Sequence, residues 1–161
     1  MMMLAACAST ERGESGITSR PPPSQPLHFA YPLIDDTGDL RSEALRGEPT
    51  IVTFLTTFDL ASQAEARFVS AVFSRHRGRI HAAAVVLEPR ENGPLVLAFR
   101  DALKLPYPVA FGDALLIGGE GPFGDVHAVP STVVLDGEGR LIWKRVGLTQ
   151  EDELEKALSG T

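Results

Sequence analysis

The chain has 161 residues, is 43% hydrophobic and 22% charged, and carries a net charge of -6 from 15 basic and 21 acidic residues. These values are typical of one ordinary globular domain. The basic residues form no run, which argues against a nucleic-acid partner, because such binding needs clustered Lys and Arg. A single cysteine, Cys7, excludes an internal disulfide, a CxxC redox pair and a multi-thiolate metal site.

The first residues resemble the start of a bacterial lipoprotein. Residues 4–7 read LAAC, similar to a lipobox, in which the signal peptidase cuts before a cysteine that is then lipidated. We interpret residues 1–7 as a truncated signal with its lipobox. Residues 8–26 are rich in Ser, Thr, Gly and Pro, a composition typical of a flexible tether. The expectation is a protein on the periplasmic side of the cell envelope, anchored by lipid on Cys7. A disordered N-terminus with a stray cysteine, on a soluble protein, is the alternative.

Residues 27–161 show the alternating strand and helix patterns of one α/β domain. The turn signal DDTGD at 35–39 separates two short strand-like pieces and predicts a β-hairpin. Segments 51–56 and 80–88 are apolar and β-branched, which predicts strands buried on both faces. Segments 107–111 and 131–147 predict a short strand and a second hairpin.

Three helices complete the predicted order. The residues expected to face the core are Ala64, Phe68, Ala71 and Val72 in the first helix, and Leu95, Ala98, Phe99 and Ala102 in the second. Residues 149–160 predict a closing helix capped by Thr149. The order of elements predicts a mixed sheet with helices on both faces.

Two segments carry a resemblance to a known family. Residues 44–65, ALRGEPTIVTFLTTFDLASQAE, are similar to the active-site region of the thioredoxin-like superfamily, in its TlpA-like and redoxin branch, whose members read close to VVVNFWATWCPPCRAE. Residues 127–147, HAVPSTVVLDGEGRLIWKRVG, resemble that family's cis-proline segment and the hairpin after it. The resemblance implies a thioredoxin-like three-layer α/β/α sandwich with a central mixed β-sheet and an N-terminal β-hairpin.

The same resemblance implies roles for five residues. Phe58 stands where the family has a Trp, Asp59 and Ser62 stand at the two redox cysteines, and Val129 precedes Pro130 at the family's cis-proline. Disulfide exchange needs a thiolate that attacks and a second thiol that resolves the mixed disulfide, and peroxide reduction also begins with a thiolate. A carboxylate and a hydroxyl supply neither, so we expect no catalytic residue and no cofactor.

The first functional interpretation is a redox-inactive thioredoxin-fold lipoprotein that acts as a binding or accessory module. Its groove, formed by Phe58, Asp59, Ser62, Val129 and Pro130, would hold an extended peptide segment of an envelope protein. A simpler reading makes Asp59 the N-cap of a helix, with Ser62 and Glu65 at the spacing of a capping box. One alternative function is the thiol-disulfide oxidoreductase or peroxiredoxin that the family implies. The other is a metal-binding protein that uses Asp59 and His127. We expect, however, that the chain has no metal site.

Overall fold

The computed structural model describes residues 17–19, 25–126 and 128–160. Six strands form one sheet in the order β1-β8-β7-β4-β5-β6, and two more strands form a hairpin. The sheet comprises β1 (Ile17–Ser19), β4 (Thr50–Leu55), β5 (His81–Val86), β6 (Val109–Phe111), β7 (Ser131–Leu135) and β8 (Leu141–Val146). The hairpin comprises β2 (Ala30–Pro32) and β3 (Asp39–Arg41). The helices are α1 (Leu60–Arg75), α2 (Gly93–Leu103), α3 (Ala114–Ile117) and α4 (Glu151–Leu158), with 3-10 turns η1 (Ser42–Leu45) and η2 (Arg90–Asn92).

Strand directions bring several loops together at one end of the central strands, the carboxyl ends of β4, β5 and β6. Strands β4, β5 and β6 are parallel neighbours, so the loops that follow them emerge at the same edge. Strand β7 runs antiparallel to β4, with Ser131 opposite Phe54, and therefore begins at that edge. We call this the loop edge. All six residues of β4 are buried, as predicted for a central strand covered on both faces.

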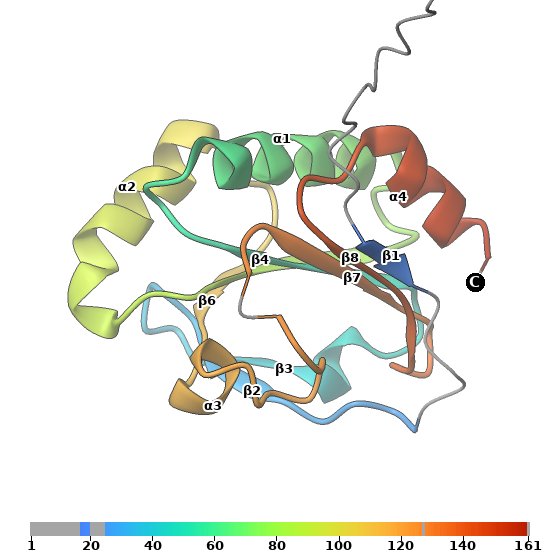
Figure 1. Cartoon of the computed structure of the whole chain (residues 1–161), viewed down its shortest axis with the longest axis horizontal. Coiled ribbons are helices and arrows are strands. Elements are labelled where there is room, and N and C mark those ends of the chain that lie inside the picture. Colours follow the sequence, from blue (N-terminus) through green and yellow to red (C-terminus); the bar gives the residue numbers. More distant parts are fainter. Residues whose placement is uncertain (1–16, 20–24, 127, 161) are drawn as a thin grey trace, which may run out of the picture.

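The sheet lies between two unequal layers (Figure 1). Helices α1, α2 and α4 cover one face, and the β2-β3 hairpin, η1 and α3 cover the other. Side chains of β4 alternate between the layers: Ile51 and Leu55 pack under the helices, whereas Val52 and Phe54 pack against the hairpin side. The predicted fold class, with its mixed sheet and N-terminal hairpin, is confirmed.

The predicted helix faces are partly wrong. The residues of α1 that are fully hidden are Ser62, Glu65, Ala66, Val69 and Val72. Of the four residues expected there, only Val72 is buried, because two polar residues on the true inner face interrupt its apolar pattern. In α2, Val96 and Phe99 are buried, whereas Leu95, Ala98 and Ala102 are exposed. This helix therefore has a second apolar face that the sheet does not cover.

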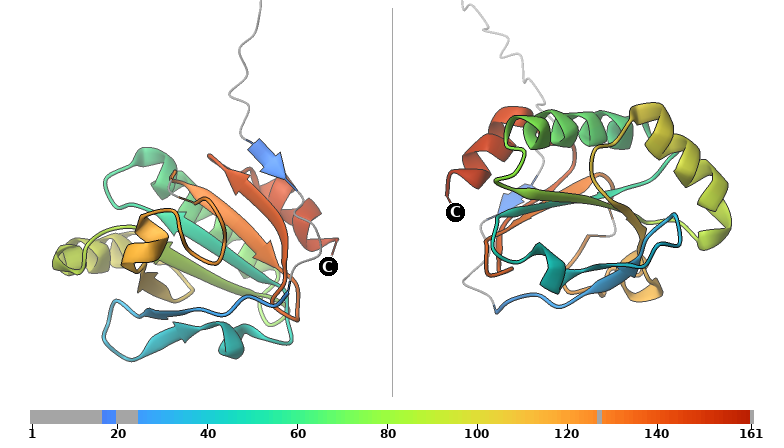
Figure 2. Two further views of the ribbon diagram at one scale, coloured as in Figure 1. Left: turned by 60° about the horizontal axis from the view of Figure 1, so that its bottom comes forward. Right: turned by 180° about the vertical axis from the view of Figure 1, so that it is seen from behind.

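Two other segments differ from the sequence interpretation. The N-cap of α4 is Gln150, which forms a capping box with Glu153, and Thr149 instead donates its backbone N–H to Glu65 at 2.7 Å. Within the predicted tether, Ile17–Ser19 form strand β1, which pairs with β8 at the edge of the sheet (Figure 2). None of the helices in the described ranges is long and apolar enough to cross a membrane.

Candidate functional site

The junction between β4 and α1 lies at the loop edge. Asp59 has an extended backbone, with φ -109° and ψ 127°, and is the N-cap of α1. Its carboxylate accepts hydrogen bonds from the backbone N–H of Ala61 at 3.1 Å and of Ser62 at 3.0 Å. The capping role of Asp59 is confirmed. The expected capping box between Ser62 and Glu65 is wrong, since both side chains bond elsewhere.

Ser62 is buried beneath Asp59 and connects two parts of the junction. Its Oγ donates to Oδ2 of Asp59 at 2.8 Å and accepts a hydrogen bond from the backbone N–H of Thr56 at 3.2 Å. Burial raises the pKa of Asp59, but the bonds from Ser62 and Ala61 outweigh it and leave the pKa below its usual value. Asp59 is therefore an anion at neutral pH, and the start of the helix uses both of its oxygens.

A buried carboxylate fixes the loop before Asp59. The backbone N–H of Thr57 donates to Oε1 of Glu88, and Nδ2 of Asn92 donates to Oε2 of Glu88 at 2.9 Å. Glu88 follows β5, so it joins the first two loops of the loop edge. Phe58 and Leu60, on either side of Asp59, are each 79% exposed. The loop is thus held by its backbone while two large apolar side chains point outward.

The segment before β7 lies at the same edge. The peptide bond between Val129 and Pro130 is cis, Pro130 is buried, and Val129 is half-buried. The carbonyl of Pro130 accepts a hydrogen bond from the N–H of Gly147 at 2.8 Å. Strand register thus brings Val129 and Pro130 to the edge that carries Phe58, Asp59 and Ser62. Their joint use as a peptide groove stays a prediction.

Two residues of the sequence interpretation cannot be placed. His127 and Cys7 lie outside the described residues, so the structure leaves the Asp59–His127 metal site and the lipid anchor untested. Within the described part of the chain, no group of three or more His, Cys, Asp or Glu residues is arranged to hold a metal ion.

Glu65 is a buried acid for which sequence reasoning assigned only a capping-box partner. It is fully buried on α1. Thr132 Oγ1 donates to its Oε1 at 2.5 Å, and the N–H of Thr149 donates to its Oε2 at 2.7 Å. Burial raises the pKa of Glu65, although these bonds and the charge of Arg145 act in the opposite direction. One feature of the sequence could have indicated that Glu65 matters: Ala64 and Glu65 match the Ala-Glu pair at the end of the family segment CPPCRAE.

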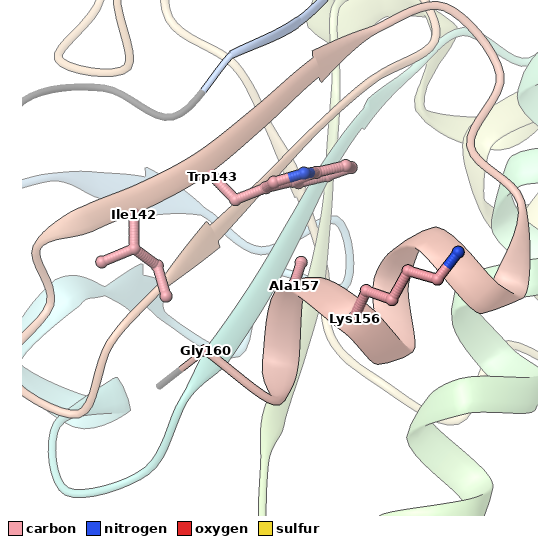
Figure 3. A pocket seen from close by; sticks show the side chains of 5 residues that line it. All are labelled: Ile142, Trp143, Lys156, Ala157 and Gly160. Carbon is pink, nitrogen blue, oxygen red and sulfur yellow. The ribbon is translucent and has the colours of Figure 1, made fainter.

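Several hollows open on the described part of the chain; one borders the predicted site, and another lies against the last helix. The larger, of about 400 Å³, opens between the start of α1 and the outer face of α2; its lining consists of Thr57, Phe58, Gln63, Leu95, Ala98, Phe99, Ala102 and Leu103. The smaller, of about 170 Å³, lies between β8 and α4 (Figure 3). There the Trp143 ring faces Ala157, away from the loop edge. Only the larger hollow contains a residue of the predicted site, Phe58.

Solved structures of similar shape decide the fold. A DsbF homologue from Corynebacterium diphtheriae aligns with a TM-score of 0.76 over 96% of this chain and 98% of its own, at 11% identity. The fold of this chain is thioredoxin-like. A thiol:disulfide interchange protein of the thioredoxin family from Chlorobium tepidum aligns with a TM-score of 0.70, 21% identity, and coverage of 88% of this chain and 98% of its own.

A third structure agrees with these two. A secreted Mycobacterium tuberculosis disulfide oxidoreductase, homologous to E. coli DsbE, aligns with a TM-score of 0.67, 14% identity, and coverage of 83% of this chain and 96% of its own. No family model matches the sequence, and no curated protein matches it significantly. At these identities the comparisons establish the fold alone.

Proposed function

We propose that this protein is a thioredoxin-fold binding module that does not exchange disulfides. The observation that carries the proposal is the state of Asp59 and Ser62, which stand where the family resemblance places the two cysteines. Asp59 is an anion that caps α1, and Ser62 is buried and bonded to it. Neither group is a sulfur nucleophile, and Cys7 is the only cysteine of the sequence.

The binding role is supported by what the loop edge retains. Phe58 and Leu60 are exposed beside a backbone that Glu88 and Asp59 hold in place. Val129 and Pro130 lie at the same edge of the sheet. A rigid backbone with exposed apolar side chains suits recognition of an extended peptide segment, because little conformational freedom is lost on binding. The partner would be another protein of the cell envelope.

The place of action would be the bacterial cell envelope. The similar Mycobacterium tuberculosis protein is described as secreted, and LAAC at residues 4–7 resembles a lipobox. Lipid on Cys7 would then tether the domain to the membrane through the segment that precedes β1, residues 8–16. Mass spectrometry of the protein purified from its own cells tests this, because the expected N-terminus is a lipidated Cys7. An unmodified Cys7 within a longer N-terminal peptide would contradict the anchor.

The redox part is tested by insulin reduction with dithiothreitol as electron donor. We expect the wild type and the Cys7→Ser variant to give the rate of the protein-free control. Circular dichroism establishes that both samples are folded. A rate above the control that survives in Cys7→Ser would overturn the proposal and favour the thiol-disulfide oxidoreductase suggested by the similar structures.

A further inference from the structure

The exposed large apolar side chains of the described residues share one edge of the sheet. Phe58 and Leu60 follow β4, Leu95 follows β5, and Leu115 and Ile117 follow β6. Because these strands are parallel neighbours, the loops and helices that carry all five residues follow the loop edge, with α2 on one face of the sheet and α3 on the other (Figure 1). Exposed apolar residues scattered singly need no explanation, but their concentration at one edge is typical of an interaction surface.

The hollow between α1 and α2 gives this edge a receptor site for an apolar side chain. Leu95, Ala98 and Ala102 follow one another along the outer face of α2, and Phe58 closes the hollow from the β4-α1 loop. No charged residue lines it, and its polar side chains are those of Thr57 and Gln63. Its volume of about 400 Å³ lies within the range of about 300–1,000 Å³ that is usual for ligand pockets. The occupant is therefore apolar at this point.

The charge of the loop edge identifies what else the occupant carries. The loops after β4, β5 and β6, up to β7, contain one basic residue, Arg90. Their acidic residues are Asp59, Glu88, Glu91, Asp113, Glu120 and Asp125. These loops thus hold a net charge of -5, against -6 for the whole chain. Lys144 of β8 also reaches these loops, because its Nζ donates to the carbonyls of Phe123 and Asp125, and with it their net charge becomes -4.

This charge distribution discriminates between possible occupants. A second copy of the chain would bring a second edge of the same negative charge, and close like charges oppose such a contact. An anionic lipid surface or a nucleic acid would be repelled for the same reason. A segment rich in Lys or Arg is attracted, and the field of the acidic loops also speeds its encounter with the protein.

We propose that the loop edge binds an extended, cationic segment of a partner protein, with one large apolar side chain of that segment in the hollow beside Phe58 and Leu95. This inference rests on the proposed binding function and names the chemical class of its partner. Apolar contact supplies affinity at the hollow, and the acidic loops select against neutral or acidic segments of the same shape.

Fluorescence anisotropy with labelled peptides tests the inference on the full chain. The probes are KLKFKLK, its acidic counterpart ELEFELE and the polar cationic KSKSKSK. We expect binding of KLKFKLK alone, weakened at least about tenfold between about 20 mM and about 500 mM salt, because salt screens exposed charges. Absence of KLKFKLK binding, or equal binding of ELEFELE or KSKSKSK, would overturn the inference.

Three variants locate the binding. Glu91→Lys reverses a charge at the loop edge, whereas the matched control Glu138→Lys makes the same change in the β7-β8 turn, where β7 ends at the opposite edge of the sheet. Leu95→Asn removes the apolar wall of the hollow at an exposed position. We expect weaker KLKFKLK binding in Glu91→Lys and Leu95→Asn and no change in Glu138→Lys. Equal loss in Glu91→Lys and Glu138→Lys, or unchanged binding in Leu95→Asn, would refute the assignment.

Failure of this inference is distinguishable from failure of the proposed function. Insulin reduction by Cys7→Ser would refute the redox-inactive module whatever the peptides do. If insulin reduction is absent and KLKFKLK does not bind, only the cationic partner is refuted.

Discussion

Ser62 Oγ donates a hydrogen bond to Oδ2 of Asp59 over 2.8 Å, so the two residues that the sequence resemblance predicts at the family's cysteine positions are bonded to each other. This hydroxyl-carboxylate pair stays intact at neutral pH, because Asp59 has a lowered pKa. The pair joins the end of β4 to the start of α1, because Ser62 Oγ also accepts the N–H of Thr56. The pair therefore has a structural role at the junction between β4 and α1.

Replacing Asp59 should therefore destabilise the domain. Asp59→Ala removes the bonds to the N–H groups of Ala61 and Ser62, and loss of an N-cap typically costs about 0.5–2 kcal/mol. Asp59→Asn keeps an acceptor at the cap and should cost less. Urea unfolding at pH 7 measures both free energies. Equal stability of Asp59→Ala and the wild type would show that the cap contributes nothing.

If the proposed function is right, cysteines in place of Asp59 and Ser62 should give the domain disulfide-exchange activity. A cysteine in place of Asp59 would sit at the start of α1, where a thiolate is stabilised, and a second in place of Ser62 lies within reach of it. We expect Asp59→Cys/Ser62→Cys, in a Cys7→Ser background, to reduce insulin faster than the protein-free control. The matched control Asp59→Ser/Ser62→Cys has one thiol and should be inactive. A folded double-cysteine variant without activity would argue against the match to the family's cysteines.

Local patterns predicted the strands and the cap of α1, because these depend on neighbours in the sequence. The β-branched run of β4 and the carboxylate of Asp59 are examples. The inner face of α1 was not predicted, since Ser62 and Glu65 are polar yet buried, with partners from the loop after β4, from β7 and from the loop before α4. Only the tertiary fold supplies those partners.

On α2 the prediction was wrong in the opposite sense, because apolar residues that were expected in the core are exposed. Leu95, Ala98 and Ala102 have the spacing of a core-facing stripe, but Val96 and Phe99 make that contact, and the stripe lines an open hollow. A sequence pattern records that residues are apolar and leaves open whether they face the core or a partner. Helix α3 was missed for a different reason: its four residues stand in a glycine-rich segment, and Asp113 caps it through the N–H of Leu116.

Glu88 should prove essential to the rigidity of the loop that carries Phe58. Glu88→Ala leaves the N–H of the half-buried Thr57 without its acceptor, and a typical intramolecular hydrogen bond contributes about 0.5–1.5 kcal/mol. We expect lower stability in urea unfolding and faster hydrogen exchange at the amide of Thr57. Glu91→Ala, an exposed acid three residues later, is the matched control and should change neither. Unchanged exchange at Thr57 in Glu88→Ala would mean that the loop is fixed by other contacts.

Glu65 gives the domain a pH-dependent stability with a defined sign. Its pKa is raised in the folded state because burial disfavours the charged form, so the native protein holds this proton more tightly than the unfolded chain does. The contribution of Glu65 is fully present below the pKa of an unfolded glutamate, about 4.3, and declines as pH rises through the raised native pKa. Asp59, with its lowered pKa, contributes in the reverse direction and loses its contribution as pH falls through its native value.

Glu65→Gln isolates this effect. The amide keeps an oxygen for the N–H of Thr149 and turns its NH₂ toward the hydroxyl of Thr132, which then accepts. The free energy of unfolding of this variant should not decline between the pKa of Glu65 in the unfolded chain and its raised pKa in the native state. The variant should therefore be more stable than the wild type at pH 8. Glu65→Ala, which leaves the N–H of Thr149 without an acceptor, should lose about 1–3 kcal/mol or more at every pH. Urea unfolding from pH 4 to 9 measures all three proteins. Parallel stability curves for Glu65→Gln and the wild type would show that the pKa of Glu65 is the same in the native and unfolded states, because Thr132, Thr149 and Arg145 then offset the effect of burial.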